Sequence, residues 1–478
     1  MAAQEGGVGL AYMGAMVLGR ARSFLCPAGL AKVFIVGLVI RLAIAPWTCC
    51  PFDTYPFYSA SVDMLAGMGM YGHAVFSYPP GFGFVMYPFM FFLSLFTDPS
   101  LFGSFHPEMI EVGMLIPTVY PFVTSPAFNL ALKLPLIIGD VLTASMLFLL
   151  MSEWKGERLG RTAYMLWFLN PLVVWISSVV GQFDVLAVLC TLVAAYFFIH
   201  ERYALAGLSV GAGMLLKVYP AYLGLFFLIY LLLVGGVAWK DRLTSVTRLI
   251  GGAAASALPA LPLLLTTPEM LDIVLRRAGN DSFGGINPWF IAPYLGIMTP
   301  SAEASTGAPD FLQTPMFITL VGLILVVIVA IVLARSSRPL RESIFAGSLV
   351  VLIIALLFRS VTNPQHLLWV LPFMLIFSFI DSRMRIPMFM LTASGLLASL
   401  TFRSFAVFFY PLAAYTPLVS VGQLNSIVFT YFSGGPVLQA TLFSLSCLLG
   451  VMAMLWAVAT ATSTPSGWIR ERLWGARE

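Results

Sequence analysis

The chain has 478 residues, of which 60% are hydrophobic and 10% are charged, and its formal net charge is +4. Soluble globular domains carry about 25% charged residues, so this composition excludes that class and indicates a polytopic membrane protein. No polar stretch is long enough for a separate soluble domain of more than about 60 residues. We therefore expect residues 1–478 to form one membrane-embedded, all-α domain, with its site built among helices and their connecting loops.

The first apolar segment, residues 30–47, follows Arg20 and Arg22 and has no small-residue cleavage pattern. We expect it to stay in the protein as the first span, because a removable signal peptide carries such a pattern. The five cysteines lack metal-ligand spacing, and the adjacent Cys49 and Cys50 would form a strained disulfide. We assign the cysteines no role.

Apolar runs of roughly 17 to 25 residues, the length that crosses a bilayer, recur along the rest of the chain. Seven clusters of Lys and Arg separate them, and such residues concentrate in cytoplasmic loops. Placing every cluster on the cytoplasmic side predicts about twelve spans with both termini inside. The expected spans are 30–47, 128–151, 162–180, 184–199, 203–218, 220–236, 246–267, 315–334, 343–360, 366–381, 386–402 and 437–461.

The same topology places two long loops outside, residues 48–127 and residues 268–314. The first loop contains an apolar stretch, 82–97, that hydropathy alone would assign as a span. A single crossing there would move the basic cluster at Lys155 to the outside and reverse every later segment. We therefore expect 82–97 to be an interfacial or re-entrant hairpin.

The first loop interrupts its apolar residues with acids, prolines and tyrosines, including Asp53, Asp63 and the sequence Tyr78-Pro79-Pro80. An unpaired carboxylate in hydrocarbon costs several kcal/mol, so a segment of this kind usually lines a water-accessible cavity. We predict that this loop forms part of the functional site. The alternative is an ordinary external loop, because loops of this composition are common.

Seven basic residues fall outside the cytoplasmic clusters, and under this topology all lie in the outer half or the outer loops. They oppose the positive-inside bias, so external carboxylates or an anionic ligand should hold them. Lys133 and Asp140 lie two helical turns apart on one face. They either bracket a polar pocket or, with Arg41, form internal salt bridges that set helix register. The seven residues are Arg41, Lys133, Lys217, Arg276, Arg277, Arg359 and Arg403.

Three short motifs place an ionisable residue at the outer end of a span. GQFD (181–184) closes the third span, KVYP (217–220) closes the fifth, and NPQH (363–366) opens the tenth. Each motif alone is weak, since a lone histidine at an interface is more often a structural hydrogen-bonding group. Together with the acidic loop they put a carboxylate, a lysine, a histidine and an arginine on one side of the membrane. Cleavage of a lipid-linked phosphate ester of a sugar requires such a set.

The chain resembles the GT-C superfamily of integral membrane glycosyltransferases in the order of six motifs: FDTYPFY, YPPGFG, FNLALKLPLIIGDVL, NPLVVWISSVVGQFD, GMLLKVYP and NPQHLLWVLPF. Within it, the chain is similar to archaeal and bacterial mannosyltransferase-like proteins and to the catalytic subunit of GPI mannosyltransferase I. The resemblance covers roughly residues 30–380 and implies the GT-C fold, whose long first external loop carries juxtamembrane helices. It implies inverting transfer of a hexose, mannose foremost, from a polyprenyl-phosphate sugar to a lipid-linked or glycan acceptor.

Carried over to this sequence, the resemblance places the catalytic acid at Asp53, which we expect to act as the general base on the acceptor hydroxyl. His366 corresponds to a polar residue that faces the donor phosphate in some members. A lipid phosphate is a good leaving group, so cations aimed at its growing charge suffice. The expected substrate-binding residues are Lys217, His366, Arg359, Arg276, Gln182, Asp184, Gln365, Tyr55, Tyr78, Lys133 and Asp140.

One departure from the family pattern bears on metal use. Members often have an acid or a histidine beside the catalytic aspartate, whereas the neighbours of Asp53 are Phe52 and Thr54. A divalent cation requires two or more oxygen ligands from the protein. We therefore predict that no metal and no other cofactor takes part.

Two other classes of protein share some of these features. A lipid flippase or secondary transporter would also show intramembrane charges and broken helices, but it should show inverted repeats, which this sequence lacks. A non-catalytic subunit of a glycosyltransferase complex would not need Asp53. The residues of the motifs KLPLIIGD and GQFD are typical of prokaryotic, and especially archaeal, sequences. We expect a cell-membrane protein whose site faces outside. Its expected partners are the sugar donor, the acceptor and the lipid bilayer, and we expect no nucleic-acid partner.

Overall fold

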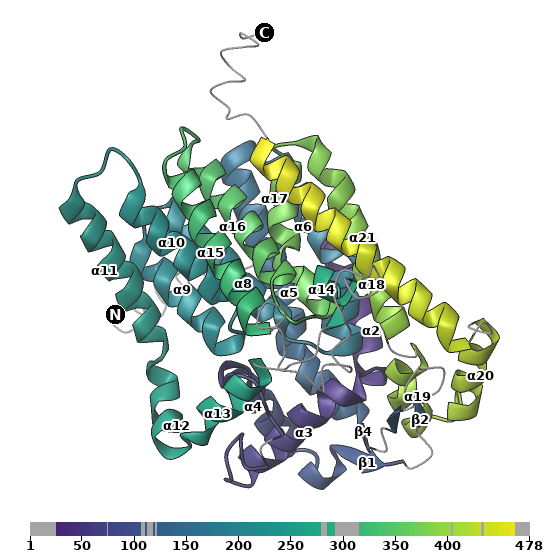
Figure 1. Ribbon diagram of the computed structural model, residues 1–478. Coiled ribbons are helices and arrows are strands. Elements are labelled where there is room, and N and C mark those ends of the chain that lie inside the picture. The colour runs from purple at the N-terminus through teal and green to yellow at the C-terminus, as the bar shows by residue number, and fades with distance from the viewer. Residues whose placement is uncertain are drawn as a thin grey trace, which may run out of the picture.

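The computed structural model describes residues 25–73, 75–106, 110–111, 118–119, 122–278, 284–291, 315–402, 405–431 and 435–463. In this part of the chain nearly all regular structure is helical, and no strand is longer than three residues (Figure 1). The expected all-α architecture is therefore confirmed. The helices pack side by side, and their apolar faces form one continuous core.

Among the described residues, six helices are long and apolar enough to cross a membrane, which makes this a multi-pass membrane protein. Helix α5 is almost surrounded by other helices, since 67% of its most apolar window is buried. The six are α5 (Pro126–Lys155), α11 continued by η4 and α12 (Trp239–Thr266), α15 (Pro315–Ala334), α16 (Leu340–Leu357), α18 (Arg385–Phe402) and α21 (Gly435–Ser463).

Two bent pairs of helices raise the number of candidate spans to eight if each pair counts as one. The first pair joins α2 (Ala31–Ile44) and η1 (Ala45–Trp47) to α3 (Pro51–Leu65) through a bend of 80°. The second pair bends by 45° at Pro171. Proline lacks a backbone N–H and cannot donate a hydrogen bond to the preceding turn, but it fits the first position of a new helix. Each bend therefore coincides with a helix start. The second pair consists of α6 (Glu157–Phe168), then α7 (Pro171–Val174) and a π-helical turn, η3 (Trp175–Val180).

The remaining expected spans are also helical but shorter. Helices of 14 to 16 residues are about 21 to 24 Å long, less than the roughly 30 Å of a bilayer core. Helix formation is thus found in all twelve expected segments, whereas twelve crossings stay a prediction. The short elements are α8 (Asp184–Ile199), α9 (Tyr203–Leu216), α10 (Pro220–Leu233), and η8 (Pro364–Trp369) followed by α17 (Leu371–Ser378).

Helices α9 and α11 (Trp239–Ser256) cross with their backbones in direct contact. A Cβ atom placed on Gly207 would lie 1.9 Å from the Leu249 carbonyl oxygen, and one on Gly252 would lie 1.9 Å from the Ala204 carbonyl oxygen. Small residues at helix crossings allow such an approach, which membrane helices use for van der Waals packing. Glycine is therefore required at both positions.

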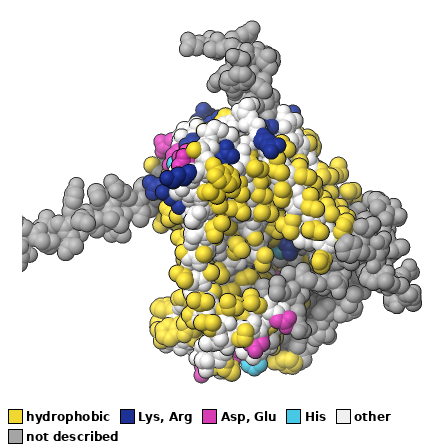
Figure 2. Space-filling view, turned by 60° about the vertical axis from the view of Figure 1, so that its left-hand side comes forward, with side chains coloured by type: hydrophobic (Ala, Val, Ile, Leu, Met, Phe, Trp, Pro, Cys, Tyr) yellow, Lys and Arg dark blue, Asp and Glu magenta, His cyan; other side chains and the backbone are white. Residues whose placement is uncertain are grey.

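The two ends of the helix bundle differ in their content of basic residues. Lys and Arg side chains gather mainly at the upper end in Figure 2, whereas acidic side chains appear at both ends. At the upper end His200 lies 3.4 Å from Glu153, and Arg338 donates to the carbonyl oxygens of Ala461 and Thr462. We call this the basic end. Three of the basic clusters that we expect on the cytoplasmic side, near residues 155, 202 and 338, lie together at this end.

The opposite end, which we call the loop end, carries elements of both long loops, among them α3 of the first and α13 (Glu269–Ala278) of the second (Figure 1). Helix α4 (Gly81–Ser94) contains most of the apolar stretch 82–97 and has 14 residues, the same length as α9 and α10, and its place as an interfacial or re-entrant hairpin stays a prediction. Strands β1 (Gly103–Phe105) and β4 (Phe122–Thr124) pair antiparallel. Within the described residues the other short elements are η2 (Pro99–Leu101), β2 (Ile110–Glu111), β3 (Thr118–Val119), η4 (Leu258–Ala260), α12 (Leu261–Thr266), α13 (Glu269–Ala278), β5 (Gly284–Gly285), α14 (Pro288–Ile291), β6 (Val361–Thr362), η9 (Ser382–Met384), η10 (Phe405–Phe409), α19 (Tyr410–Tyr415) and α20 (Val421–Tyr431).

Candidate functional site

Two of the predicted motifs meet in an ion pair between Lys217 and Asp184. Lys217 follows the last residue of α9 with an extended backbone, and Asp184 is the first residue of α8. The Lys217 Nζ atom lies 3.2 Å from Asp184 Oδ2, and the carboxylate is fully buried. The ammonium also lies over the rings of Phe183, at 4.3 Å, and Tyr78, at 5.0 Å. Motifs KVYP and GQFD therefore form one site, with Tyr78 of the first loop against it.

Trp369 connects this ion pair to the third motif. Its indole Nε1 donates to Asp184 Oδ1 at 2.8 Å, and its ring stacks on Tyr219 with centroids 3.7 Å apart. The Arg359 guanidinium lies 5.1 Å from the centre of the same ring, and the His366 ring lies 4.7 Å away. We call Lys217, Asp184, Tyr219, Arg359, His366 and Trp369 the Trp369 cluster.

Sequence reasoning did not select Trp369 or Tyr219. Both lie inside quoted motifs, since Trp369 belongs to NPQHLLWVLPF and Tyr219 to KVYP. An apolar motif with one tryptophan offers no signal that the indole N–H faces a buried carboxylate 185 positions earlier. A buried indole N–H nevertheless usually finds an acceptor, and the few buried acids limit which residue that acceptor is.

His366 is held in one orientation by its own turn. Its Nδ1 atom accepts a hydrogen bond from the Asn363 backbone N–H at 3.0 Å, and the side chain is nearly buried. The neutral imidazole therefore carries its proton on Nε2. This arrangement makes the Nε2–H of His366 a hydrogen-bond donor, the role expected for a residue that faces a phosphate.

Asp53 lies in the first turn of α3, directly after the 80° bend, and is half-buried. Among the residues that the structure describes, no side chain or backbone group makes a hydrogen bond or ion pair with its carboxylate. One turn later Phe57 packs on Tyr78, with centroids 5.7 Å apart, and on Phe183, at 5.8 Å. The helix that carries Asp53 thus rests on the two rings beneath Lys217.

The helix start provides an electrostatic setting for this carboxylate. Backbone N–H groups of a first helical turn point toward the helix start and favour negative charge there. The Cys50 N–H, just before α3, donates to the Val180 carbonyl oxygen at 3.3 Å, which ties the start of α3 to the GQFD turn. The start of the helix that carries Asp53 is therefore tied to the turn that precedes Asp184, and the Asp53 carboxylate has no partner among the described residues.

Lys133 and Asp140 do not share a pocket. Asp140 forms an ion pair with Arg41, with Nε and Oδ2 2.8 Å apart, and accepts a hydrogen bond from Ser177 Oγ at 2.6 Å. All these side chains are fully buried. Lys133 instead donates to backbone oxygens, including those of Ala45 and Val179 at 3.0 Å. The geometry therefore favours internal salt bridging for Arg41 and Asp140 over the shared pocket.

The remaining expected binding residues differ in their settings. Gln182 is fully buried, and within the described residues neither of its side-chain amide atoms has a hydrogen-bond partner. A buried amide in that state offers a place for a ligand hydroxyl or a water molecule. Gln365 is half-buried, and Tyr55 is 43% exposed with its ring against Phe122. Arg276 belongs to α13, but its side chain lies outside the described part of the chain.

The loop between α3 and α4 lies beside Tyr78 and is held by its own hydrogen bonds. The Tyr71 hydroxyl donates to the Tyr78 carbonyl oxygen at 2.7 Å, and burial raises the pKa of this phenol. His73, which is largely exposed, holds the buried Asp63 carboxylate with Nδ1 2.7 Å from Oδ1. Asp63 therefore has a partner within its own loop and does not pair with one of the outer cations among the described residues.

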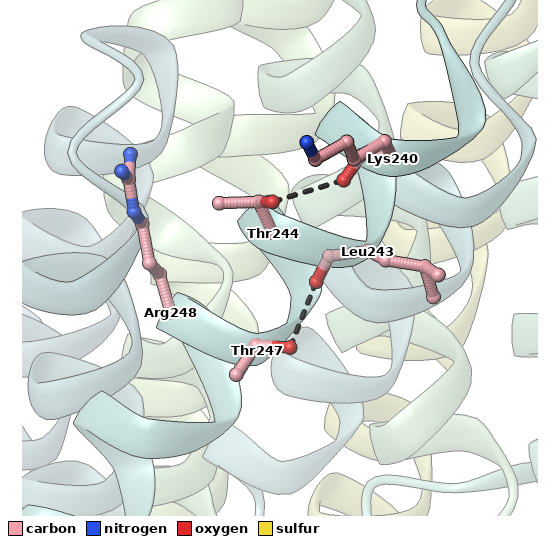
Figure 3. Close-up of a pocket in the computed structure, with 5 residues that line it drawn as sticks. All are labelled: Lys240, Leu243, Thr244, Thr247 and Arg248. Carbon is pink, nitrogen blue, oxygen red and sulfur yellow. Dashed lines mark hydrogen bonds between the residues drawn. The ribbon is translucent and has the colours of Figure 1, made fainter.

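A hollow of about 470 Å³ lies elsewhere, on the outer face of α11 (Figure 3). It is lined by Lys240, Leu243, Thr244, Thr247 and Arg248, all from this helix. The Thr244 and Thr247 hydroxyls each donate to a carbonyl oxygen four residues earlier, at 2.9 Å, so their protons are used within the helix. The hollow shares no residue with the Trp369 cluster, and we assign it no part in the site.

Metal ligands do not converge in the described part of the chain, where no three His, Cys, Asp or Glu side chains lie close enough to hold an ion. Independence from metal stays a prediction, to be tested with a chelator. No protein-family model matches the sequence, and a search of the curated proteins finds no match. The function must therefore be argued from the geometry of Asp53 and the Trp369 cluster.

Proposed function

We propose that the protein is an inverting glycosyltransferase that moves a hexose, mannose foremost, from a polyprenyl-phosphate sugar to a lipid-linked or glycan acceptor. One observation carries the proposal. Lys217, Asp184 and His366, from three separate motifs, meet around Trp369, and the helix that carries Asp53 packs on the rings beneath Lys217. Together with Arg359, which lies over the same ring, this combination supplies two cations and an imidazole N–H donor for a phosphate, and a carboxylate for a hydroxyl.

In the donor half of the site, Lys217, Arg359 and His366 stabilise the negative charge that the phosphate gains as the sugar departs. Preorganised charges in a buried setting stabilise such charge strongly, because water screens them little. Asp184 keeps Lys217 in place through their 3.2 Å contact. The arrangement suits a lipid phosphate entering from the bilayer, because the cluster lies at the ends of apolar helices, on the side proposed to face outward.

In the acceptor half of the site, Asp53 takes the proton from the attacking hydroxyl. A general base must be within about 3 Å of that hydroxyl and must not be neutralised by a strong partner. The half-buried carboxylate, with no ion pair among the described residues, meets the second condition. Gln182, whose amide atoms have no partner among the described residues, and Tyr55, which is 43% exposed, are the proposed contacts for sugar hydroxyls and rings.

The proposed setting is a prokaryotic, archaeal cell membrane, with the GT-C fold, about twelve crossings and the site facing outside. The division between a basic end and a loop end supports this orientation, because Lys and Arg favour the cytoplasmic side. The 80° bend between α2 and α3 supports a juxtamembrane role for α3. The donor, the acceptor and the bilayer are the proposed partners.

The test is incubation of the purified protein with a panel of polyprenyl-phosphate sugars, with donor hydrolysis or sugar transfer as the readout. Asp53→Asn, purified in the same way, is the control for a contaminating enzyme. We expect turnover with one sugar class and loss of that turnover in the variant. Intact donor in every reaction, with donor still bound, would instead favour a non-catalytic subunit, and movement of unchanged donor across vesicles would favour a flippase.

A further inference from the structure

Lys133, in the first third of α5 (Pro126–Lys155), is fully buried and surrounded by protein oxygens. Its Nζ atom lies 2.5 Å from the Thr48 carbonyl oxygen and 3.1 Å from Thr48 Oγ1. It lies 3.0 Å from the carbonyl oxygens of both Ala45 and Val179. An ammonium group has three protons, so these four oxygens satisfy it fully.

Three of these oxygens belong to helix ends. Ala45 and Thr48 lie where α2 and η1 end, and Val179 lies in the last turn of the π-helical segment η3. Carbonyl groups in the last turn of a helix have no partner within it, and a cation near them is stabilising. Lys133 therefore caps the ends of two helices at once.

The same two ends are also bonded to each other. Thr48 Oγ1 contacts the Ser178 carbonyl oxygen at 3.1 Å, and the Cys50 N–H donates to the Val180 carbonyl oxygen at 3.3 Å. With the contact from Lys133 to Val179, three successive carbonyl groups of η3 are taken by Lys133 and the 48–50 turn. The next residue, Gly181, has φ +82°, and a Cβ there would lie 3.1 Å from Lys133 Cε.

Both of the capped turns lead directly into the proposed site. The 48–50 turn leads into α3 and Asp53, and η3 leads through Gly181 and Gln182 to Asp184. A displacement of either turn would move one acid relative to the other. Misplacement of reacting groups by about 1 Å is enough to lower an enzymatic rate by about 10²-fold.

We propose that Lys133 is a positioning residue, which holds the turn before Asp53 and the turn before Asp184 in fixed register. It binds no substrate in this arrangement, because its protons are directed to protein oxygens. The structural part of the inference stands on the hydrogen bonds alone, and its consequence for turnover rests on the proposed function. The two parts can be measured separately.

The reactivity of the native cysteines measures whether Lys133 holds the 48–50 turn in place. Cys49 and Cys50 are buried within the 48–50 turn, at 0% and 4% exposure, and Cys447 is equally buried on α21. Folded wild-type protein and Lys133→Met are treated with a maleimide, and labelling is measured for each cysteine-containing peptide by mass spectrometry. We expect labelling of Cys49 and Cys50 to be at least about tenfold faster in the variant, with Cys447 unchanged.

Two further variants keep the test decisive if Lys133→Met does not fold. Lys133→Gln retains two N–H donors, and Thr48→Val removes one of the four oxygens together with the tie to Ser178. Both should increase Cys49 and Cys50 labelling by a smaller factor. Gln439→Leu is the matched control, since it removes a buried bond to the Thr401 carbonyl that joins α21 to α18, and it should leave the labelling unchanged.

Turnover per folded molecule completes the experiment. We expect it to fall at least about tenfold in Lys133→Met, in parallel with the labelling. Unchanged labelling would overturn the inference, and lost donor binding with unchanged labelling would show that Lys133 contacts substrate. Faster labelling in a protein that turns over no sugar donor, wild type included, would support the positioning of the turns and count against the proposed function.

Discussion

At the scale of single residues, the candidate site, within the described part of the chain, contains one carboxylate without an ion-pair partner and cations that other side chains hold in place. Asp53 is half-buried without an ion pair among the described residues, whereas Lys217 is fixed by Asp184 and by two aromatic rings. The two kinds of residue should therefore respond differently to substitution.

Asp53→Asn should slow turnover by about 10² to 10⁴, the usual contribution of a positioned general base. Donor binding should persist, because the substitution leaves the Trp369 cluster unchanged. Turnover and donor affinity are to be measured on the same folded preparation. Normal turnover in this variant would remove the central claim of the proposed function.

Lys217→Met and His366→Ala should weaken donor binding and slow turnover together, because both side chains act on the phosphate before and during departure of the sugar. Lys217→Met also leaves the buried Asp184 without its cation, which is destabilising. The double variant Lys217→Met with Asp184→Asn is therefore the control for folding. If it recovers folded yield and also recovers turnover, Lys217 has only a structural role.

Activity should persist in the presence of a chelator, because Phe52 and Thr54, which flank Asp53, offer no second carboxylate and fixed cations match the leaving phosphate. The measurement is turnover after treatment with EDTA, with and without added Mg²⁺ or Mn²⁺. Loss of turnover that a divalent ion restores would contradict a metal-free mechanism.

At the scale of elements, the residues of the candidate site lie at the ends of helices. Asp53 lies in the first turn of α3, Asp184 begins α8, Lys217 directly follows α9 and His366 lies in η8. Prolines next to these ends stop one helix and start the next, as Pro51 and Pro220 do. The site is therefore built where irregular backbone lies at the end of the bundle, a position that membrane proteins tolerate when it faces protein or water.

The crossing of α9 and α11 gives a prediction at this scale. Gly207→Leu should reduce folded yield sharply, because its side chain would collide with the Leu249 carbonyl and force the backbones apart. Gly251→Leu, on the outer face of α11 with open space around its Cβ position, is the matched control. Yield is measured by gel filtration in detergent. Equal yields would show that the close crossing does not stabilise the fold.

At the scale of the whole molecule, the bundle has a basic end and a loop end. Contacts among described residues already join the expected cytoplasmic clusters, as in the pair of His200 with Glu153. Both long loops contribute elements to the other end (Figure 1). This polarity sets the side of the membrane on which the proposed reaction takes place.

The polarity can be tested with one exposed position at each end. Cysteine introduced at Ser100, in the first loop, should react with an impermeant reagent added outside cells. Cysteine introduced at Arg158, at the basic end, should react only after the membrane is opened. The reverse pattern would contradict both the external loop and the twelve-span topology.

The sequence alone determined the membrane class, the positions of the helices and several members of the candidate site. Hydropathy and charge are local properties, so helical segments such as 184–199 agree with α8 at both ends. Motif order selected Lys217, Asp184 and His366, which the structure brings together. Helix-breaking residues marked where these side chains would lie.

Only the tertiary structure decided which of these residues meet. Arg41 pairs with Asp140 across 99 positions, and Trp369 bonds to Asp184 across 185. Spacing along one helix placed Lys133 near Asp140, but the packing of three chain segments directs its ammonium to carbonyl groups instead. Such contacts depend on how helices cross and where they break, and those relations arise from packing the whole bundle rather than from any local pattern of residues.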